Sequence, residues 1–206
     1  MAADRPALYF VRHGETDWNR ARRIQGRTDV PLNAAGRAQA AAIGRRLKQL
    51  VDAPETLDFY SSPLSRARQT MAAILSAFSL PHDHAQVDER LVERGFGAFD
   101  GMTWRELFAA GIDPDRDPAS YHDWRPDGGE SFADVADRVG AWLSYVHRPA
   151  IVVSHSGVSR ALRGLILGLD KAEIVHLDVP QHRFFRLAEG RVEWFDLRLP
   201  STTEAS

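Results

Sequence analysis

Two histidines and two arginines lie where short apolar segments of this chain end. Arg12 and His13 follow the apolar residues 7–11, Arg66 follows the letters SSPLS, and His155 follows AIVVS. The imidazole of a histidine can attack phosphorus, and the planar guanidinium of an arginine matches the oxygens of a phosphate group. Flanking arginines also disfavour the protonated imidazole, which keeps a ring nitrogen free for attack. The four residues could therefore accept a phosphoryl group if the fold brings them together.

Phosphoryl transfer to a histidine also needs an acid that protonates the leaving oxygen. The segment 88–101, DERLVERGFGAFDG, contains three candidate carboxylates, Asp88, Glu89 and Glu93. One of these carboxyl groups or the second histidine could be the acid, and the composition of the segment does not distinguish among them.

Apolar segments of strand length alternate with helical patterns, which predicts repeated βα units. We expect a three-layer α/β/α fold with a mostly parallel central sheet. Strands are expected at 7–11, at 57–62 and in 150–157, a strand that ends in Ser154-His155-Ser156-Gly157. The helix after the first strand is capped by Asn33, and the helix after the second has Pro63 at its first position.

The carboxyl ends of parallel strands meet at one edge of a sheet, where loops lead into the N-termini of helices. Arg12, His13, Arg66 and His155 all follow predicted strands, so we expect them at this edge although the two histidines lie far apart in the chain. Helix N-termini offer free backbone N–H groups and a partial positive charge, which suit a phosphate. The sequence therefore predicts a phosphate site at this edge.

The segment from about 100 to 130 is rich in Pro, Gly and Asp and has no sustained period, so we expect a surface excursion that covers the site. Its aromatic residues more often pack a loop than contact a ligand. Because they flank the expected site, they are candidates for shaping the pocket of the leaving group. They are Trp104, Phe108, Tyr121 and Trp124.

After the excursion we expect a helix capped by Ser131. Near the end of the chain we expect a two-stranded hairpin that turns at Glu189-Gly190. We expect residues 1–206 to form a single domain. The last six residues, STTEAS, are expected to form a frayed tail.

The chain has 206 residues, a net charge of −2 and no cysteine. Disulfides, thiolate metal sites and a cysteine nucleophile are therefore excluded, and no general attraction to nucleic acid or to an anionic membrane is expected. The first residues, MAADRP, lack an apolar run of signal-peptide length, and no stretch reaches the ~18 consecutive apolar residues of a membrane span, so we expect neither. We expect a cytoplasmic protein whose partner is a small phosphorylated substrate. The oligomeric state is open.

Several motifs in this order resemble those of the histidine phosphatase superfamily, the phosphoglycerate mutase-like proteins. Together they cover roughly residues 7 to 160, and the ordered set is far more specific than a lone Arg-His-Gly. They are VRHGETDWN, RIQGRTDVPLNAAGRAQA, SSPLSRARQT, LVERGFGAFDG, GGES and VSHSG.

The resemblance implies a phosphoglycerate mutase-like fold and a metal-independent reaction without a cofactor. It implies that His13 carries the phosphoryl group, that Arg12, Arg66 and His155 hold its oxygens, and that Glu93 is the general acid and base. The substrate-binding positions that it implies are Asn19, Gln25, Gly26, the N–H of Ser156 and, ranked lowest, Arg68, which is two residues from Arg66 on a helix and so points elsewhere.

Two features depart from the family pattern. The last motif is more often Thr-His-Gly-Gly, so Ser156 adds bulk beside the phosphate, while the hydroxyl of Ser154 can replace that of threonine. The segment between Glu93 and Glu130 is short compared with the long insertion of the cofactor-dependent mutases. This favours a phosphomonoesterase over a phosphoglycerate-type mutase, which is the alternative, and a catalytically inactive phosphate-binding module is a weaker third reading.

Other readings of single motifs are weaker. Each histidine alone is more often structural than catalytic, and only the whole set reverses that expectation. The letters PHDHA, with His82 and His84, offer no evident third metal ligand. The letters SHSG lack the first glycine of the G-x-S-x-G motif of serine hydrolases.

Overall fold

The computed structural model describes residues 5–197, which contain one six-stranded sheet in the order β3-β2-β4-β1-β5-β6. β3, β2, β4 and β1 pair in parallel, and β5 and β6 form an antiparallel hairpin beside β1. The predicted mostly parallel sheet is thus confirmed. The strands are β1 (Leu8–Arg12), β2 (Asp58–Ser61), β3 (Gln86–Val87), β4 (Ala150–Ser154), β5 (Arg183–Ala188) and β6 (Arg191–Asp196).

β1 and β4 form the centre of the sheet because their side chains are apolar on both faces, and every residue of β4 is buried. They pair in parallel with Arg12 opposite Ser154. β2 lies on the other side of β4, with Ser61 opposite Val153. The residues that follow these three strands therefore leave the sheet next to one another, at its carboxyl edge.

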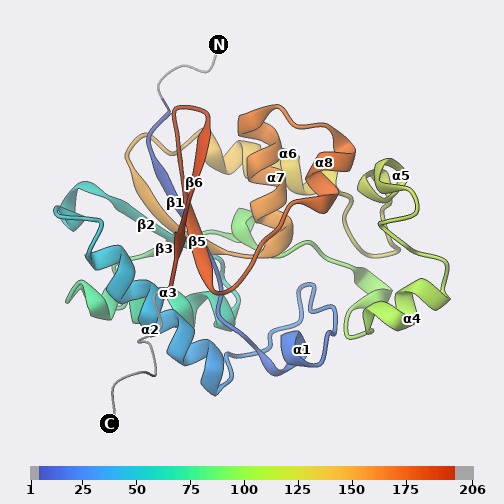
Figure 1. Ribbon diagram of the computed structural model, residues 1–206, viewed down its shortest axis with the longest axis horizontal. Coiled ribbons are helices and arrows are strands. Elements are labelled where there is room, and N and C mark those ends of the chain that lie inside the picture. The colour runs from blue at the N-terminus through green and yellow to red at the C-terminus, as the bar shows by residue number, and fades with distance from the viewer. Residues whose placement is uncertain (1–4, 198–206) are drawn as a thin grey trace, which may run out of the picture.

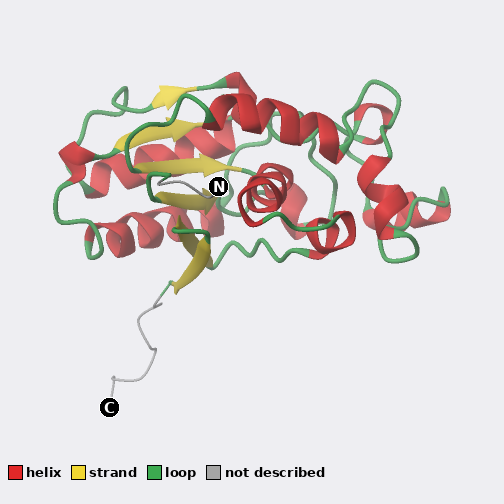
Figure 2. Ribbon diagram, turned by 90° about the horizontal axis from the view of Figure 1, so that it is seen from above, coloured by secondary structure: helices red, strands yellow, loops and turns green. Residues whose placement is uncertain are grey.

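Helices cover both faces of the sheet, which completes the predicted three layers (Figures 1 and 2). α2 and α3 pack on one face, and α6 and α7 pack on the other. The helices are α1 (Asp17–Arg20), α2 (Ala34–Lys48), α3 (Ser65–Ala77), α4 (Trp104–Ala109), α5 (Pro118–Asp123), α6 (Phe132–Leu143), α7 (Ser156–Leu167) and α8 (Lys171–His176), with 3₁₀ turns at Pro54–Thr56, Glu89–Leu91 and Gly97–Phe99.

Two local predictions differ from the structure. Pro63 precedes the first helical position, because α3 is capped by Leu64 and starts at Ser65. The segment 100–130 is not free of regular structure, since Thr103 caps α4 and Asp117 caps α5, both too short to show a period. Figure 1 shows these two helices beside the sheet rather than on either face.

The predicted caps of the longer helices are confirmed. The side chain of Asn33 accepts from the backbone N–H of Gly36 at the start of α2. Ser131 and Asp134 form a reciprocal capping box at the start of α6. Glu189 lies at the turn of the β5-β6 hairpin. The predicted frayed tail, 201–206, lies outside the described residues.

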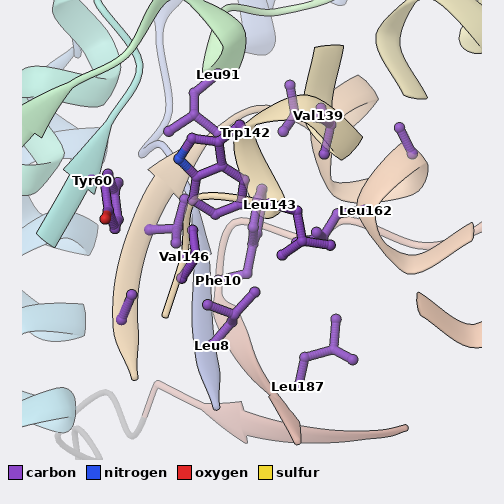
Figure 3. Packing of buried hydrophobic residues seen from close by; sticks show 14 of the residues in the cluster. Leu8, Phe10, Tyr60, Leu91, Val139, Trp142, Leu143, Val146, Leu162 and Leu187 are labelled. Atoms are coloured by element: carbon purple, nitrogen blue, oxygen red, sulfur yellow. The ribbon is translucent and has the colours of Figure 1, made fainter. Parts of the chain in front are cut away.

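The core on the α6 and α7 face is centred on Trp142 (Figure 3). Its side chain is 1% exposed and meets the ring of Tyr60 edge to face, with ring centroids 5.5 Å apart. Phe10 of β1 stacks on Phe185 of β5 in the same cluster. This packing fixes α6 and the central strands as one body.

Replacing Trp142 by alanine should lower the free energy of unfolding by ~3–5 kcal/mol, because a large buried aromatic leaves a cavity. Urea titration of the folded protein measures this loss. Tyr145, just beyond the same helix, is 67% exposed, so Tyr145→Ala is the matched control and should cost less than ~1 kcal/mol. Equal losses for the two variants would contradict the assigned core.

Candidate active site

His13 leaves the end of β1 and is 2% exposed. Its Nδ1 lies 2.8 Å from the carbonyl oxygen of Gly14. Because a carbonyl can only accept, Nδ1 carries the proton and Nε2 is the nitrogen with a free electron pair. Burial and the neighbouring Arg66 and Arg12 hold the pKa of His13 well below its usual value. The imidazole is therefore neutral and can act as a nucleophile.

Arg12 and Arg66 are positioned by backbone carbonyls rather than by carboxylates. Arg12 donates from Nη1 to the carbonyl of Val179. Arg66, fully buried at the start of α3, donates to the carbonyls of Thr28 and Gly26 at 2.7 and 2.9 Å. The Nε of each is buried without a hydrogen-bond partner among the described residues. Both cations therefore keep donors and positive charge for a bound anion.

His155 caps α7 at the end of β4, and its ring centroid lies 5.1 Å from that of His13. Its Nε2 lies 2.7 Å from the hydroxyl of Ser62, which follows β2. Burial, then Arg66 and His13, lower the pKa of His155 well below the usual value. The parallel register of β1, β4 and β2 thus places His13, His155 and Ser62 next to one another at the carboxyl ends of these strands.

Glu93 lies against the N-terminus of α7. Its Oε1 accepts from the N–H groups of Arg94 and Gly157, and its Oε2 accepts from the N–H and the hydroxyl of Ser156, all within 2.8–3.1 Å. A Cβ at Gly157 would lie 2.6 Å from Oε1, so a larger residue there would displace the carboxylate of Glu93. Ser156, expected to contact phosphate, directs both of its donors to Glu93 in this structure.

Arg12, His13, Arg66 and Glu93 line one pocket of about 110 Å³. This is small compared with the ~300–1,000 Å³ of typical sites for drug-sized ligands, so the pocket suits a compact substrate. The predicted residues that line it are Arg12, His13, Asn19, Gln25, Gly26, Arg66, Glu93 and Ser156, while His155 packs against His13 without lining the pocket.

Other predicted residues lie elsewhere. Arg68 lines a separate hollow with His82, beside β3, and is not brought to the pocket. Of the three carboxylates left open by the sequence, Asp88 pairs with Arg90 at 2.7 Å, Glu89 is exposed, and only Glu93 lines the pocket.

Trp104 and Tyr121 line the pocket as expected, together with Phe96 and Phe132. Phe108 is 47% exposed, and neither it nor Trp124 lines this pocket. The excursion therefore contributes one aromatic side chain from each of its two short helices.

The family described as the histidine phosphatase superfamily (branch 1) matches residues 8–196. This chain belongs to the histidine phosphatase superfamily. It is 37% identical over 164 residues to the metal-independent phosphoserine phosphatase of Arabidopsis thaliana, covering 75% of this chain and 66% of that protein, just under two thirds. It is 36% identical over 180 residues to the glucosyl-3-phosphoglycerate phosphatase of Mycolicibacterium vanbaalenii, covering 79% and 74%.

A third relative, the "Probable phosphoglycerate mutase" of Salmonella paratyphi C, is 35% identical over 178 residues, covering 79% of this chain and 75% of that protein. Among solved structures, mycobacterial glucosyl-3-phosphoglycerate phosphatase complexed with VO3 is 30% identical, with a TM-score of 0.76 over 93% of this chain and 96% of that one. The fold of this chain is therefore phosphoglycerate mutase-like.

Sequence reasoning missed the arginines Arg23, Arg94 and Arg160, which also line the pocket. Arg94 directly follows Glu93 in the sequence. Arg160 lies four residues after Ser156, one helical turn further along α7, so helical spacing could have indicated it.

The segment 177–181, between α8 and β5, was also missed. Three consecutive carbonyls in it accept from arginines: Leu177 from Arg160, Asp178 from Arg163 and Val179 from Arg12. Gln181 then donates to the carbonyl of His13 and to Oδ1 of Asn19, both at 3.1 Å. This segment, although distant in the sequence, positions Arg12, His13 and Asn19. The residue types of 177–181 do not indicate this role.

Within residues 5–197 no group of three or more His, Asp or Glu side chains could hold a metal ion. His82 and His84 do not converge, since His82 contacts the hydroxyl of Ser76 and His84 packs against Phe59. No helix in the described part of the chain is long and apolar enough to cross a membrane.

The lowered pKa values of His13 and His155 predict a pH-dependent stability. Both are neutral when folded, whereas the unfolded chain takes up protons below about pH 6.5. Stability is therefore fully present above that pH and falls as the pH decreases from 6.5 toward the lowered folded values, by up to ~1.4 kcal/mol per pH unit for each histidine.

Urea titrations between pH 7.5 and 5 measure this slope. His155→Gln should reduce the slope by up to ~1.4 kcal/mol per pH unit. His147→Gln, at an exposed position, should leave it unchanged. The same slope in His155→Gln and in the unchanged protein would show that His155 is not held neutral.

Proposed function

We propose that this histidine phosphatase is a metal-independent phosphomonoesterase that hydrolyses a small phosphorylated metabolite through a phosphohistidine on His13. The observation that carries the proposal is the neutral imidazole of His13, whose Nε2 is free beside two carbonyl-held arginines, with Glu93 lining the same pocket. The family membership supports a phosphatase or a mutase.

In the first step, Nε2 of His13 attacks phosphorus as the bond to the ester oxygen breaks. Protonated Glu93 gives its proton to the departing oxygen, so the alcohol leaves neutral. The charge on the transferring phosphoryl group is stabilised by Arg12, Arg66 and His155. The Nδ1–H of His13 stays on the carbonyl of Gly14, which keeps the ring in the attacking tautomer.

In the second step, a water molecule attacks the phosphohistidine and the bond between Nε2 and phosphorus breaks. The carboxylate of Glu93, held by the N–H groups of Ser156 and Gly157, takes a proton from the water. Inorganic phosphate is released, and His13 returns to its neutral form. Each proton that Glu93 gives in the first step is thus regained in the second.

The compact pocket supports a small substrate, and two relatives bear the names of phosphatases. A mutase is the second candidate, because another relative bears that name. A mutase would return the phosphoryl group to a second hydroxyl instead of to water, and the short segment between Glu93 and Glu130 favours the phosphatase.

The test is hydrolysis of 4-nitrophenyl phosphate and 3-phosphoglycerate with a chelator present. We expect free phosphate from both, and no turnover in His13→Ala. Isomerisation of 3-phosphoglycerate without free phosphate would favour the mutase, and loss of activity on chelation would contradict metal independence. No turnover between pH 5 and 8 would favour an inactive phosphate-binding module.

Glu93→Gln should slow cleavage of an alkyl phosphate by ~10²–10⁴-fold in kcat/KM, because an alkoxide leaves poorly without a proton. The loss for 4-nitrophenyl phosphate should be less than ~10-fold, since that phenolate leaves without help. The ratio kcat/KM isolates the first step from the water attack, which both substrates share.

Glu89→Gln is the matched control, because Glu89 is an exposed carboxylate in the same segment and does not line the pocket. It should leave kcat/KM for both esters unchanged. Equal losses of the two esters in Glu93→Gln would rule out proton donation by Glu93.

A further inference from the structure

Two side-chain amides meet beside the pocket, and the mechanism described above uses neither. Asn19 lines the pocket, whereas Gln181 lies between Asn19 and the backbone of His13 without lining it. The Nε2 atom of Gln181 donates to Oδ1 of Asn19 and to the carbonyl oxygen of His13, both at 3.1 Å. One amide group thus connects a pocket residue to the residue assigned as nucleophile.

The hydrogen bonds of Asn19 determine which way its amide points. The backbone N–H of Thr16 can only donate, and it lies 3.1 Å from Oδ1 of Asn19. The hydroxyl of Thr16 donates to the same oxygen at 3.1 Å. Because this oxygen faces Thr16 and Gln181, the Nδ2 group faces away from them, and it has no hydrogen-bond partner among residues 5–197. Its two N–H donors are therefore free to bind a phosphate oxygen in the pocket.

Gln181 stabilises this orientation of the Asn19 amide. If that amide turned over, its Nδ2 would face the N–H of Thr16 and the Nε2 of Gln181, so donors would oppose donors. Gln181 cannot relieve the conflict by turning its own amide, because its Nε2 also donates to the carbonyl of His13. No other group among residues 5–197 donates to that carbonyl. The two amides therefore hold each other in one orientation.

The same contact fixes the peptide unit between His13 and Gly14. The carbonyl of this unit accepts from Gln181, and its N–H donates to the hydroxyl of Thr70 in α3 at 3.1 Å. The hydroxyl of Thr70 in turn donates to the carbonyl of Arg66 at 2.8 Å. Two distant parts of the chain thus bind the two ends of one peptide unit, which restricts the backbone rotation that would move the imidazole of His13.

We propose that Gln181 is a positioning residue with two effects: it directs the Nδ2 donors of Asn19 toward the phosphoryl group, and it holds the backbone of His13 in the position for attack. The inference rests on the proposed function and adds a residue that acts on the same pocket from outside it. Precise placement matters here, since a displacement of about 1 Å can cost ~10²-fold in rate.

The test combines Gln181→Met and Asn19→Ala, singly and together, at a temperature at which circular dichroism shows every variant folded. The kcat/KM for 4-nitrophenyl phosphate reports the attack by His13, and calorimetry with inorganic phosphate reports the donors of Asn19. Gln181→Met keeps the length of the side chain without its donors. It should lower kcat/KM about 10- to 100-fold and the affinity for phosphate about 3- to 10-fold.

The two effects should separate in the Asn19→Ala background. Adding Gln181→Met there should change the affinity for phosphate by less than about twofold, because no amide is left to direct. It should still lower kcat/KM by about 10-fold or more, through the backbone of His13. The same loss of phosphate affinity with and without Asn19 would indicate a merely structural residue and would overturn the proposal. An unchanged kcat/KM in Gln181→Met would also overturn it.

His182→Ala is the matched control. His182 is exposed and follows Gln181 directly, and within residues 5–197 only its backbone carbonyl accepts a hydrogen bond, from the N–H of Leu197. Both measurements should stay within about twofold of those of the unchanged protein. Losses in His182→Ala equal to those in Gln181→Met would show that any change in this segment suffices, which would overturn the specific role of Gln181.

Phosphate binding separates this inference from the proposed function, because it needs no turnover. Weaker binding in Gln181→Met that disappears in the Asn19→Ala background supports the proposal even if no ester is hydrolysed. If 4-nitrophenyl phosphate is hydrolysed and Gln181→Met behaves like His182→Ala in both measurements, the proposed function stands and the role of Gln181 is overturned.

Discussion

The structure depends on holding several arginines in one pocket without neutralising them. Arg66 and Arg94 are buried, and Arg12 and Arg160 are partly so, yet backbone carbonyls and not carboxylates orient all four. A carbonyl satisfies a guanidinium N–H through its dipole but leaves the net charge in place. Removing cations from water is costly when they are unpaired. In the proposed function, an anionic substrate is the partner that these cations lack.

The same charge sets the chemistry of the histidines. In ordinary surroundings a histidine beside a bound phosphate would gain a proton and lose its nucleophilic nitrogen. Here burial and the flanking Arg66 lower the pKa of His13 and of His155, so in the proposed function the arginines that bind the anion also keep the attacking imidazole neutral. Glu93 has no ion pair with these cations among the described residues, because N–H groups at the N-terminus of α7 bind its carboxylate.

The sequence predicted the parts of this site that lie at strand ends. β1 and β4 are short apolar runs, and their ends place Arg12, His13 and His155 by parallel pairing alone. The choice of Glu93 over Asp88 and Glu89 needed the family resemblance, since no periodicity distinguishes three carboxylates in a loop. Arg94 and the 177–181 segment could not be found, because their roles depend on carbonyls that only the folded chain brings near.

The 177–181 segment links the completion of the pocket to the last part of the fold. Val179 contacts Arg12 across 167 positions, and Gln181 reaches back to His13 across 168. Contacts at such separation require a loop of most of the chain to close, which costs conformational entropy. During synthesis, the first motif leaves the ribosome long before its last supporting carbonyls do. The pocket is therefore complete only once segment 177–181 has been made, and a chain truncated before this segment would lack the contacts that hold Arg12 and the carbonyl of His13.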